Sequence, residues 1–446
     1  MFMNEYEVVV IGGGTAGVAS AQAAAGQGAR VGLVEARRPG GHSLFKGQLP
    51  LQVLRKKMES SGDKIPLGAL VQAMEEKAEQ TSREILEDLQ NAGVEWIQGE
   101  GSLAGGHQVL VHHDAQPSTL KAGKVILASG SRVKPVTMIP FDDQTILPLD
   151  GLLNWDETPA SVLIVGGDTS ALETAQLFHL LGTKVFLVDK NHRLIHQQDP
   201  DLISALEAGF KKQKIKVLLG KKIISLFKGN DQIDITLDGG VKFSTERMLV
   251  SGERLGNTEK LGLDPLNIEK GGNHEIWVNE TMETSLQGVF AAGSVTGRSH
   301  SREISEEEGR VAGINAAGGR QTLERGQIPF CLHTDPEIAS IGCLSGDAHF
   351  KGYRAVEGRY DVGGGKESGN PSEGFCKVIA DRDSKRIIGA QFLGGQASES
   401  MRHLQSTLRE GASIRDVVQS GDENPIFFKP VIKAAKACLR ALSAKR

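Results

Sequence analysis

The chain has 446 residues, a formal net charge of −4 and 24% charged residues. This length gives room for about two to four domains, and the slight acidic excess excludes a general nucleic-acid binder. The sequence holds no apolar stretch of about 18 residues and no leader-like N-terminus, which predicts a cytoplasmic protein without a membrane span. Its four cysteines, none spaced as Cys-x-x-Cys, predict neither a disulfide framework nor a metal site.

The N-terminal segment predicts a dinucleotide-binding βαβ unit. A β-branched run at 8–11 predicts a buried strand, and an Ala-rich helix and a second strand at 31–34 follow it. The glycine motif between strand and helix allows a tight turn, lets a pyrophosphate approach the backbone, and lets the helix pack closely. An acid at the end of the second strand would bind the ribose hydroxyls. The predicted cofactor-binding residues here are Gly12, Gly14, Thr15, Ala16, Gly17 and Glu35.

An altered copy of this pattern starts with a predicted strand at 162–165. Its three glycine positions hold Gly166, Asp168 and Ala171, and the second strand again ends in an acid, Asp189. Alanine is tolerated at the third position, but a carboxylate at the second would repel a pyrophosphate where it comes closest. We therefore expect weak binding of a nicotinamide dinucleotide, with NADH preferred over NADPH because of Asp189.

After about residue 330, short alternating strands and two helical stretches predict an α+β domain. Several motifs in order now resemble one family along nearly the whole chain: GGGTAG with Glu35, VILASGS at 125–131, GERLGN at 252–257, GVFAAGSVTG at 288–297 and TDPEIASIG at 334–342. The family is the class I FAD-dependent pyridine nucleotide–disulfide oxidoreductases, which include dihydrolipoamide dehydrogenase, glutathione reductase and mercuric reductase.

The resemblance implies an α/β fold with two Rossmann-like dinucleotide-binding domains and a C-terminal α+β dimerisation domain. The implied domains are an FAD-binding domain at 1–150 and 276–328, an NAD(P)-type domain at 151–275 and a dimerisation domain at 329–446. The protein is then a homodimer with bound FAD. The motifs add Ser129, Gly130, Gly293 and Ser294 to the predicted FAD-binding residues. Ser294 stands where the family has an aspartate that binds the ribityl chain.

The same resemblance shows where the chemistry of the family breaks down. Ser43 and Gln48 stand at the positions of the two redox cysteines, and neither can form a disulfide. The family's histidine base is Asn424, which cannot shuttle protons at neutral pH, and the glutamate five residues after it is Lys429. The lysine beside the flavin is Gln52, although its glutamate partner remains as Glu173.

We therefore predict a flavin oxidoreductase without a disulfide relay, which passes electrons to a small non-disulfide acceptor or to a protein partner. Two alternatives stay open: a non-catalytic FAD-binding scaffold, and a reductase that uses the thiols of a partner. The sequence assigns no catalytic residue. A nucleophile pair of His42 and Ser43 is disfavoured because the sequence reveals no acid to orient the histidine. His333, in a predicted strand, is interpreted as a packing residue.

Overall fold

The computed structural model describes residues 5–47, 51–53, 65–105, 107–113, 117–195, 197–298, 301–362, 374–422 and 425–443. Gln48 and Asn424, at two of the positions that depart from the family, lie outside the described residues. The chain divides into two compact units. The first holds residues 1–166, 180–183 and 223–323, and the second holds residues 167–179, 184–222 and 324–446. The predicted division into domains stays a prediction.

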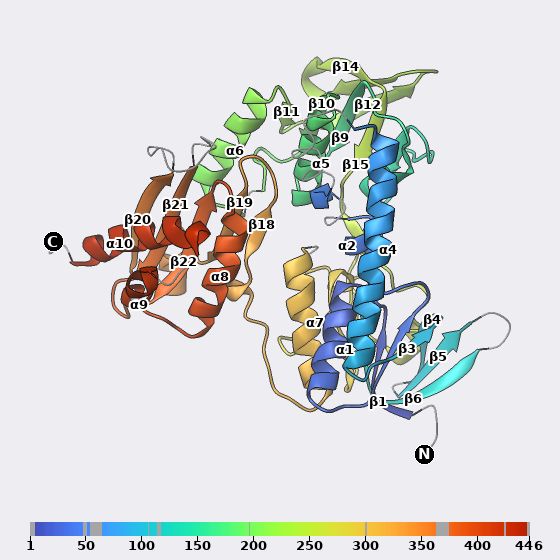
Figure 1. Cartoon of the computed structure of the whole chain (residues 1–446). Coiled ribbons are helices and arrows are strands. Elements are labelled where there is room, and N and C mark those ends of the chain that lie inside the picture. The colour runs from blue at the N-terminus through green and yellow to red at the C-terminus, as the bar shows by residue number, and fades with distance from the viewer. Residues whose placement is uncertain are drawn as a thin grey trace. The chain divides into compact units, whose positions relative to one another are not determined.

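A seven-stranded sheet forms the centre of the first unit, counted over the described residues (Figure 1). In the middle lies β1 (Glu5–Ile11), which pairs in parallel with a strand on either side. Its β-branched residues are buried on both faces, as expected of a central parallel strand. Around it lie β2 (Val31–Glu35), β3 (Glu95–Gln98), β6 (Ser118–Leu127) and β17 (Val289–Ala291), all in parallel pairs, and the antiparallel β4 (Glu100–Gly105) and β5 (Gln108–His112).

Two helices of the first unit, α1 (Thr15–Gly26) and α7 (Arg302–Ala316), lie side by side against this sheet (Figure 1). Their backbones touch through glycines: a Cβ added at Gly309 would lie 2.2 Å from the carbonyl oxygen of Ala16. The close contact fixes where α7 and the loop before it stand relative to the start of α1. The same unit also contains the short α2 (Gly41–Phe45) and the long α4 (Leu67–Asn91).

Among the described residues, the remaining strands of the first unit form three groups of paired strands. One is the parallel set β8 (Ile146–Pro148), β15 (Arg247–Val250) and β9 (Ser161–Val165). The second is the antiparallel meander β12 (Ile223–Lys228), β13 (Ile233–Leu237) and β14 (Lys242–Thr245). The third pairs β7 (Ser131–Val133) with β16 (Arg254–Gly256). The described part of this unit also contains the 3-10 helices η1 (Leu149–Asn154), η2 (Asp238–Gly240), η3 (Asp264–Leu266) and η4 (Ser294–Thr296).

The second unit contains a five-stranded antiparallel sheet in its described part. The strand order is β18 (Phe330–Leu332), β19 (Ile338–Gly342), β22 (Ile387–Leu393), β21 (Gly374–Asp381) and β20 (Ala355–Val362). The helices α8 (Ala397–Arg409), α9 (Ile414–Gln419) and α10 (Lys429–Ser443) pack on it (Figure 1). The unit also holds α5 (Thr169–Leu180) up to its last residue, α6 (Pro200–Lys212) and the parallel pair of β10 (Lys184–Asp189) and β11 (Lys216–Leu219). Among the described residues, no helix combines the length and the apolar character needed to cross a membrane.

The contact between α1 and α7 leads to the first prediction. Gly309→Ala places a methyl group against the carbonyl of Ala16 and forces the helices apart, so we expect a loss of about 1–3 kcal/mol in the free energy of unfolding. Gly26→Ala, at the end of α1, is the matched control because a Cβ there meets nothing within 4 Å. Urea unfolding of both variants measures the difference, and equal stability would contradict the packing argument.

Candidate functional site: a glycine-lined dinucleotide cradle

The turn that follows β1 is closed by contacts that only glycine allows. Gly12 has a φ of +105°, and a Cβ there would lie 2.4 Å from the carbonyl oxygen of Ala128. A Cβ at Gly17 would lie 1.7 Å from the carbonyl oxygen of Gly12. The first turn of α1 therefore presses directly on the end of β1, as the motif predicts.

No protein side chain covers the N-terminus of α1 among the described residues. Its N-cap residue is Gly14, and no side chain caps the helix. A Cβ added at Gly14 would meet only the Cα of Gly41, at 3.9 Å, within the range of ordinary contact. The backbone N–H groups that start at Thr15 and Ala16 can thus receive an anion such as a pyrophosphate.

Glu35 faces this turn from the end of β2. Its carboxylate accepts the backbone N–H of Gly13 at 2.7 Å and that of Arg37 at 2.9 Å. Each oxygen keeps a further lone pair, so the fixed carboxylate can still accept a ribose hydroxyl. The position agrees with the role that the fingerprint predicts for this acid.

The other predicted residues meet the turn from two different loops. A Cβ at Gly130, whose φ is +77°, would lie 3.8 Å from the hydroxyl oxygen of Ser294. A Cβ at Gly293 would lie 2.7 Å from the Cβ of Ala16. The hydroxyl of Ser129 is buried and has no hydrogen-bond partner among the described residues, as expected of a group that awaits a ligand. We call the assembled set the cradle: Gly12, Gly14, Thr15, Ala16, Gly17, Glu35, Ser129, Gly130, Gly293 and Ser294.

Glu308 is a residue of this site that the sequence reasoning missed. It is fully buried on α7, where its carboxylate accepts the N–H of Gly293 at 2.9 Å and the hydroxyl of Thr296 at 3.2 Å. It therefore holds the turn that carries Ser294. The helical spacing of Ser305, Glu308 and Ala312 on the buried face of α7 is the signal that could have found it.

The altered second fingerprint differs at its helix N-terminus. In front of α5, the carboxylate of Asp168 accepts the backbone N–H of Ala171 at 3.0 Å, as a helix-capping side chain does. The acid at the end of the second strand still lies against the glycine turn, as Glu35 does in the first copy. A Cβ added at Gly167 would lie 2.8 Å from a carboxylate oxygen of Asp189. A negative charge of the protein itself thus stands where the first copy leaves an open N-terminus.

Next to the cradle, a cluster links α2 to η1 and β16. The Nε2 atom of His42 lies 2.8 Å from Asp150, and Arg254 binds both oxygens of the same carboxylate at 3.1 and 3.0 Å. Burial raises the pKa of Asp150, but the hydrogen bond and charge of His42 and the charge of Arg254 outweigh it and hold the pKa far below its usual range. The interpretation that no acid orients His42 is therefore wrong. The sequence hides the pair because its two members lie on separate elements.

Two further sequence predictions concern the second unit. The carboxylate of Glu173, buried on α5, accepts the backbone N–H of His333 at 2.8 Å. The imidazole of His333 lies 3.2 Å from Glu337, so this histidine is more than a packing residue. Burial raises the pKa of Glu337, yet the hydrogen bonds from His333 and Ser398 bring it below its usual range.

The four cysteines are not suited to thiol chemistry. All four are free and buried, and all belong to the second unit: Cys331, Cys343, Cys376 and Cys438. Burial raises the pKa of Cys376 far above its usual range and that of Cys438 to about 11. Reactive thiols have a lowered pKa and an exposed sulfur, whereas all four of these cysteines are buried and the pKa values of Cys343, Cys376 and Cys438 are raised.

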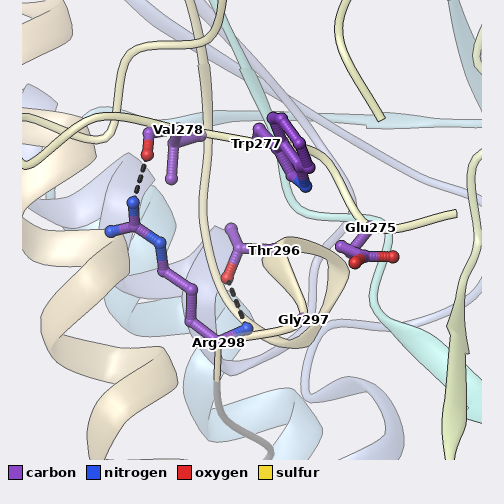
Figure 2. Close-up of a pocket in the computed structure, with 6 residues that line it drawn as sticks. All are labelled: Glu275, Trp277, Val278, Thr296, Gly297 and Arg298. Atoms are coloured by element: carbon purple, nitrogen blue, oxygen red, sulfur yellow. Dashed lines mark hydrogen bonds between the residues drawn. The ribbon is translucent and has the colours of Figure 1, made fainter. Parts of the chain in front are cut away.

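Figure 2 shows an open pocket of about 410 Å³ in the first unit, lined by Glu275, Trp277, Val278, Thr296, Gly297 and Arg298. Two of the lining residues belong to the turn that starts at Ser294: Thr296 is the last residue of η4, and Gly297 follows it. The guanidinium of Arg298 donates to the carbonyl of Val278, and its backbone N–H lies 3.5 Å from the hydroxyl of Thr296. The guanidinium thus links Arg298, just after η4, to the segment at Val278.

Comparison with known families covers almost the whole chain. Residues 6–316 match the family model described as pyridine nucleotide-disulphide oxidoreductase. Residues 328–434 match the model for the dimerisation domain of the same group, which supports the predicted homodimer.

Individual relatives agree with these matches. The dihydrolipoyl dehydrogenase of Bacillus subtilis is 29% identical over 97% of this chain and 98% of its own. A soluble pyridine nucleotide transhydrogenase of Mycobacterium bovis is 26% identical over 99% of both chains. The solved LpdA structure of Mycobacterium tuberculosis has a TM-score of 0.88 at 21% identity and covers 97% of this chain and 99% of that chain. The likeness in structure confirms the predicted fold class.

The open front of the cradle can be tested at Gly14. Gly14→Ala meets no close protein atom, so the fold should survive, but the methyl group stands where a pyrophosphate approaches the helix. We expect the variant to lose bound FAD, with at least a tenfold weaker affinity, and to unfold within about 0.5–1 kcal/mol of the native protein. Flavin absorbance after gel filtration measures the loss, and Gly26→Ala should keep its flavin. A fully yellow Gly14→Ala protein would contradict this site.

The effect of the carboxylate in the altered second copy can be tested at Asp168. Asp168→Gly removes the charge in front of α5 and should strengthen NADH binding about 10- to 100-fold. Asp168→Asn is the matched control, because an amide keeps a hydrogen-bond acceptor for Ala171 but carries no charge. If charge is the obstacle, both variants gain affinity by titration calorimetry. If the side chain's bulk is the obstacle, only the glycine variant gains, and no gain in either would overturn the argument.

Proposed function

Because the chain belongs to the pyridine nucleotide-disulphide oxidoreductase family, we propose that it is an FAD-dependent oxidoreductase that works without a disulfide relay. The family is FAD-dependent and uses NAD(P)H as its pyridine nucleotide. In this proposal the electrons pass from the flavin to a non-disulfide acceptor, a small quinone-like molecule or a redox protein.

One observation supports the proposal: the predicted residues of the cradle lie together, and Ser43 stands beside them at the position of a redox cysteine. Ser43 lies on α2, one residue beyond His42, and a hydroxyl cannot form a disulfide or accept two electrons. The four cysteines are buried in the second unit, with raised pKa values for Cys343, Cys376 and Cys438. None is suited to replace an exposed redox thiol.

The residues of the cradle fit FAD. Gly14 and the first turn of α1 would hold the pyrophosphate, Glu35 the adenosine ribose, and Ser129 and Ser294 the remaining polar groups with their hydroxyls. The orphaned, buried hydroxyl of Ser129 supports this fit. Bound FAD would supply hydride and single-electron transfer, and the protein would supply its binding and orientation.

A second candidate function is a non-catalytic, FAD-binding homodimeric scaffold. The observation that favours it is Asp168, whose carboxylate caps α5 where a nicotinamide dinucleotide would place its own negative charge. A scaffold would bind FAD at the cradle but would take no electrons from NADH.

The deciding experiment follows the flavin spectrum of the purified dimer without oxygen. Addition of NADH, and separately of NADPH, should bleach the flavin slowly, and menadione or ferricyanide should restore it. Dithionite provides a reduction that does not depend on the nicotinamide site. A flavin that dithionite reduces but that neither NADH nor NADPH bleaches, or that neither acceptor reoxidises, would point to the scaffold and overturn the oxidoreductase.

The proposed absence of a disulfide relay leads to a separate prediction. We expect no turnover of lipoamide, oxidised glutathione or mercuric ion with NADH or NADPH, because Ser43, Gln48 and Asn424 replace two thiols and their base. The double variant Ser43→Cys, Gln48→Cys should gain a disulfide by thiol titration but still show no turnover, since the base is also missing. Turnover by the native protein that thiol alkylation abolishes would contradict the proposal.

A protein redox partner and a cytoplasmic location belong to the same proposal. The four free thiols are typical of a reducing compartment, which supports the location. Copurification of the reduced, dithionite-treated dimer with an electron-accepting protein would support the partner.

A further inference from the structure

We propose that one end of the sheet in the second unit docks reversibly on a membrane surface that carries anionic lipid headgroups. The docking surface combines two aromatic side chains with four lysine and arginine side chains: Phe350, Tyr353, Lys351, Arg382, Lys385 and Arg386. We call it the basic-aromatic surface. It belongs to neither dinucleotide motif, so the inference does not depend on the proposed function.

Two connections of the five-stranded sheet meet at this end. One joins β19, which ends at Gly342, to β20, which begins at Ala355. The other is the hairpin between β21, which ends at Asp381, and β22, which begins at Ile387. Because β20 and β21 are antiparallel neighbours with Ala355 opposite Asp381, the two connections lie side by side.

The connection before β20 presents its aromatic side chains on a well-held turn. The side chain of Phe350 is 86% exposed and that of Tyr353 is 41% exposed. Ala348 is buried beneath them, and its carbonyl accepts the backbone N–H of Lys351 at 3.1 Å and that of Tyr353 at 3.0 Å. The turn is thus fixed by its own backbone while the ring of Phe350 stays in water, so burial of this ring in another apolar medium would stabilise a complex.

The neighbouring hairpin is attached directly to this turn. The backbone N–H of Arg382 donates to the carbonyl of Arg354 at 2.8 Å. The carboxylate of Asp381 accepts the backbone N–H of Arg354 at 3.0 Å and that of Ser384 at 2.8 Å. The cations of the hairpin therefore have a defined position next to the aromatic turn.

Positive charge prevails at this end of a chain whose net charge is −4. Residues 347–354 and 381–386 together hold five lysines and arginines and three aspartates. Of the aspartates, Asp381 is buried in the hydrogen bonds above, Asp383 pairs with Arg354 at 3.0 Å, and Asp347 is exposed. Four cations form no ion pair with the described residues: Lys351, Arg382, Lys385 and Arg386.

This composition fits a lipid surface better than a contact with a protein or with a second copy of the chain. Protein interfaces are poor in charge, and in lysine above all, at their centre. Phe350 is instead followed directly by Lys351 and stands beside a cationic hairpin. At a bilayer surface, aromatic rings enter the boundary between headgroups and acyl chains while lysine and arginine contact anionic headgroups. Both kinds of side chain thus find their partners in the same layer.

Co-sedimentation of the purified, FAD-loaded dimer with vesicles tests the proposal. Vesicles of phosphatidylcholine with about one-third phosphatidylglycerol should bind the protein about tenfold or more tightly than vesicles of phosphatidylcholine alone. Added salt should weaken the binding, because it screens the attraction between exposed charges.

Two variants separate the contribution of charge from that of the ring. Lys351→Glu with Lys385→Glu reverses two cations and should weaken binding to the anionic vesicles about tenfold or more. Phe350→Ser removes the exposed ring and should weaken it about three- to tenfold. The matched controls change exposed residues elsewhere and should bind as the native protein does: Lys212→Glu with Lys242→Glu, and Phe227→Ser.

A fluorescence measurement reports the position of the ring directly. In Phe350→Trp, anionic vesicles should shift the additional tryptophan emission to the blue, and brominated lipid should quench it. Phe227→Trp, at a side chain that is 67% exposed on β12, should show neither change.

Each outcome bears on the proposal. Failure of the native protein to bind anionic vesicles, or equal binding by native protein and both surface variants, would overturn it. Dissociation of the dimer in Phe350→Ser, measured by sedimentation equilibrium, would identify a contact between copies instead and would also overturn it. None of these measurements involves electron transfer, so the proposed function can fail while the docking surface stands, and the reverse.

Discussion

The backbone contact at the end of β1 is the constraint on which the rest of the first unit depends. Gly17 and Gly12 bring the first turn of α1 onto the strand, and the carbonyl of Ala128 closes the turn from the neighbouring strand. Gly309 then brings α7 onto α1 at Ala16. The loops that carry Ser129 and Ser294 reach the same point only because these helices and strands touch through their backbones.

The parts of this site that could be predicted from the sequence are the parts that one short segment determines. The strand, the glycine turn and the acid at Glu35 belong to one βαβ unit, so the period of the apolar residues and the glycine spacing define them. The capping role of Asp168 is local in the same sense. The helical spacing of α7 could have predicted that Glu308 is buried, but it could not have predicted the shape of the turn that Glu308 holds.

The pairing of His42 with Asp150 could not be predicted in this way. The two residues lie on different elements, and only the folded chain brings the carboxylate to the ring. Arg254 adds a third element, β16, whose pairing with β7 places the guanidinium beside Ser131. A half-buried carboxylate held between a histidine and an arginine is a property of the tertiary structure, and neither residue type nor local spacing predicts it.

The two dinucleotide motifs have similar backbones and differ by one charge at the helix N-terminus. In each, an acid lies against the middle of the glycine turn: Glu35 against Gly13, and Asp189 against Gly167. They differ at the helix N-terminus, which is open at Gly14 and occupied by the carboxylate of Asp168 in the other copy. A pyrophosphate brings two negative charges to that place, so we expect the first copy to attract a dinucleotide that the second copy repels. We therefore expect tight binding of the flavin and weak binding of NADH to have a common electrostatic origin.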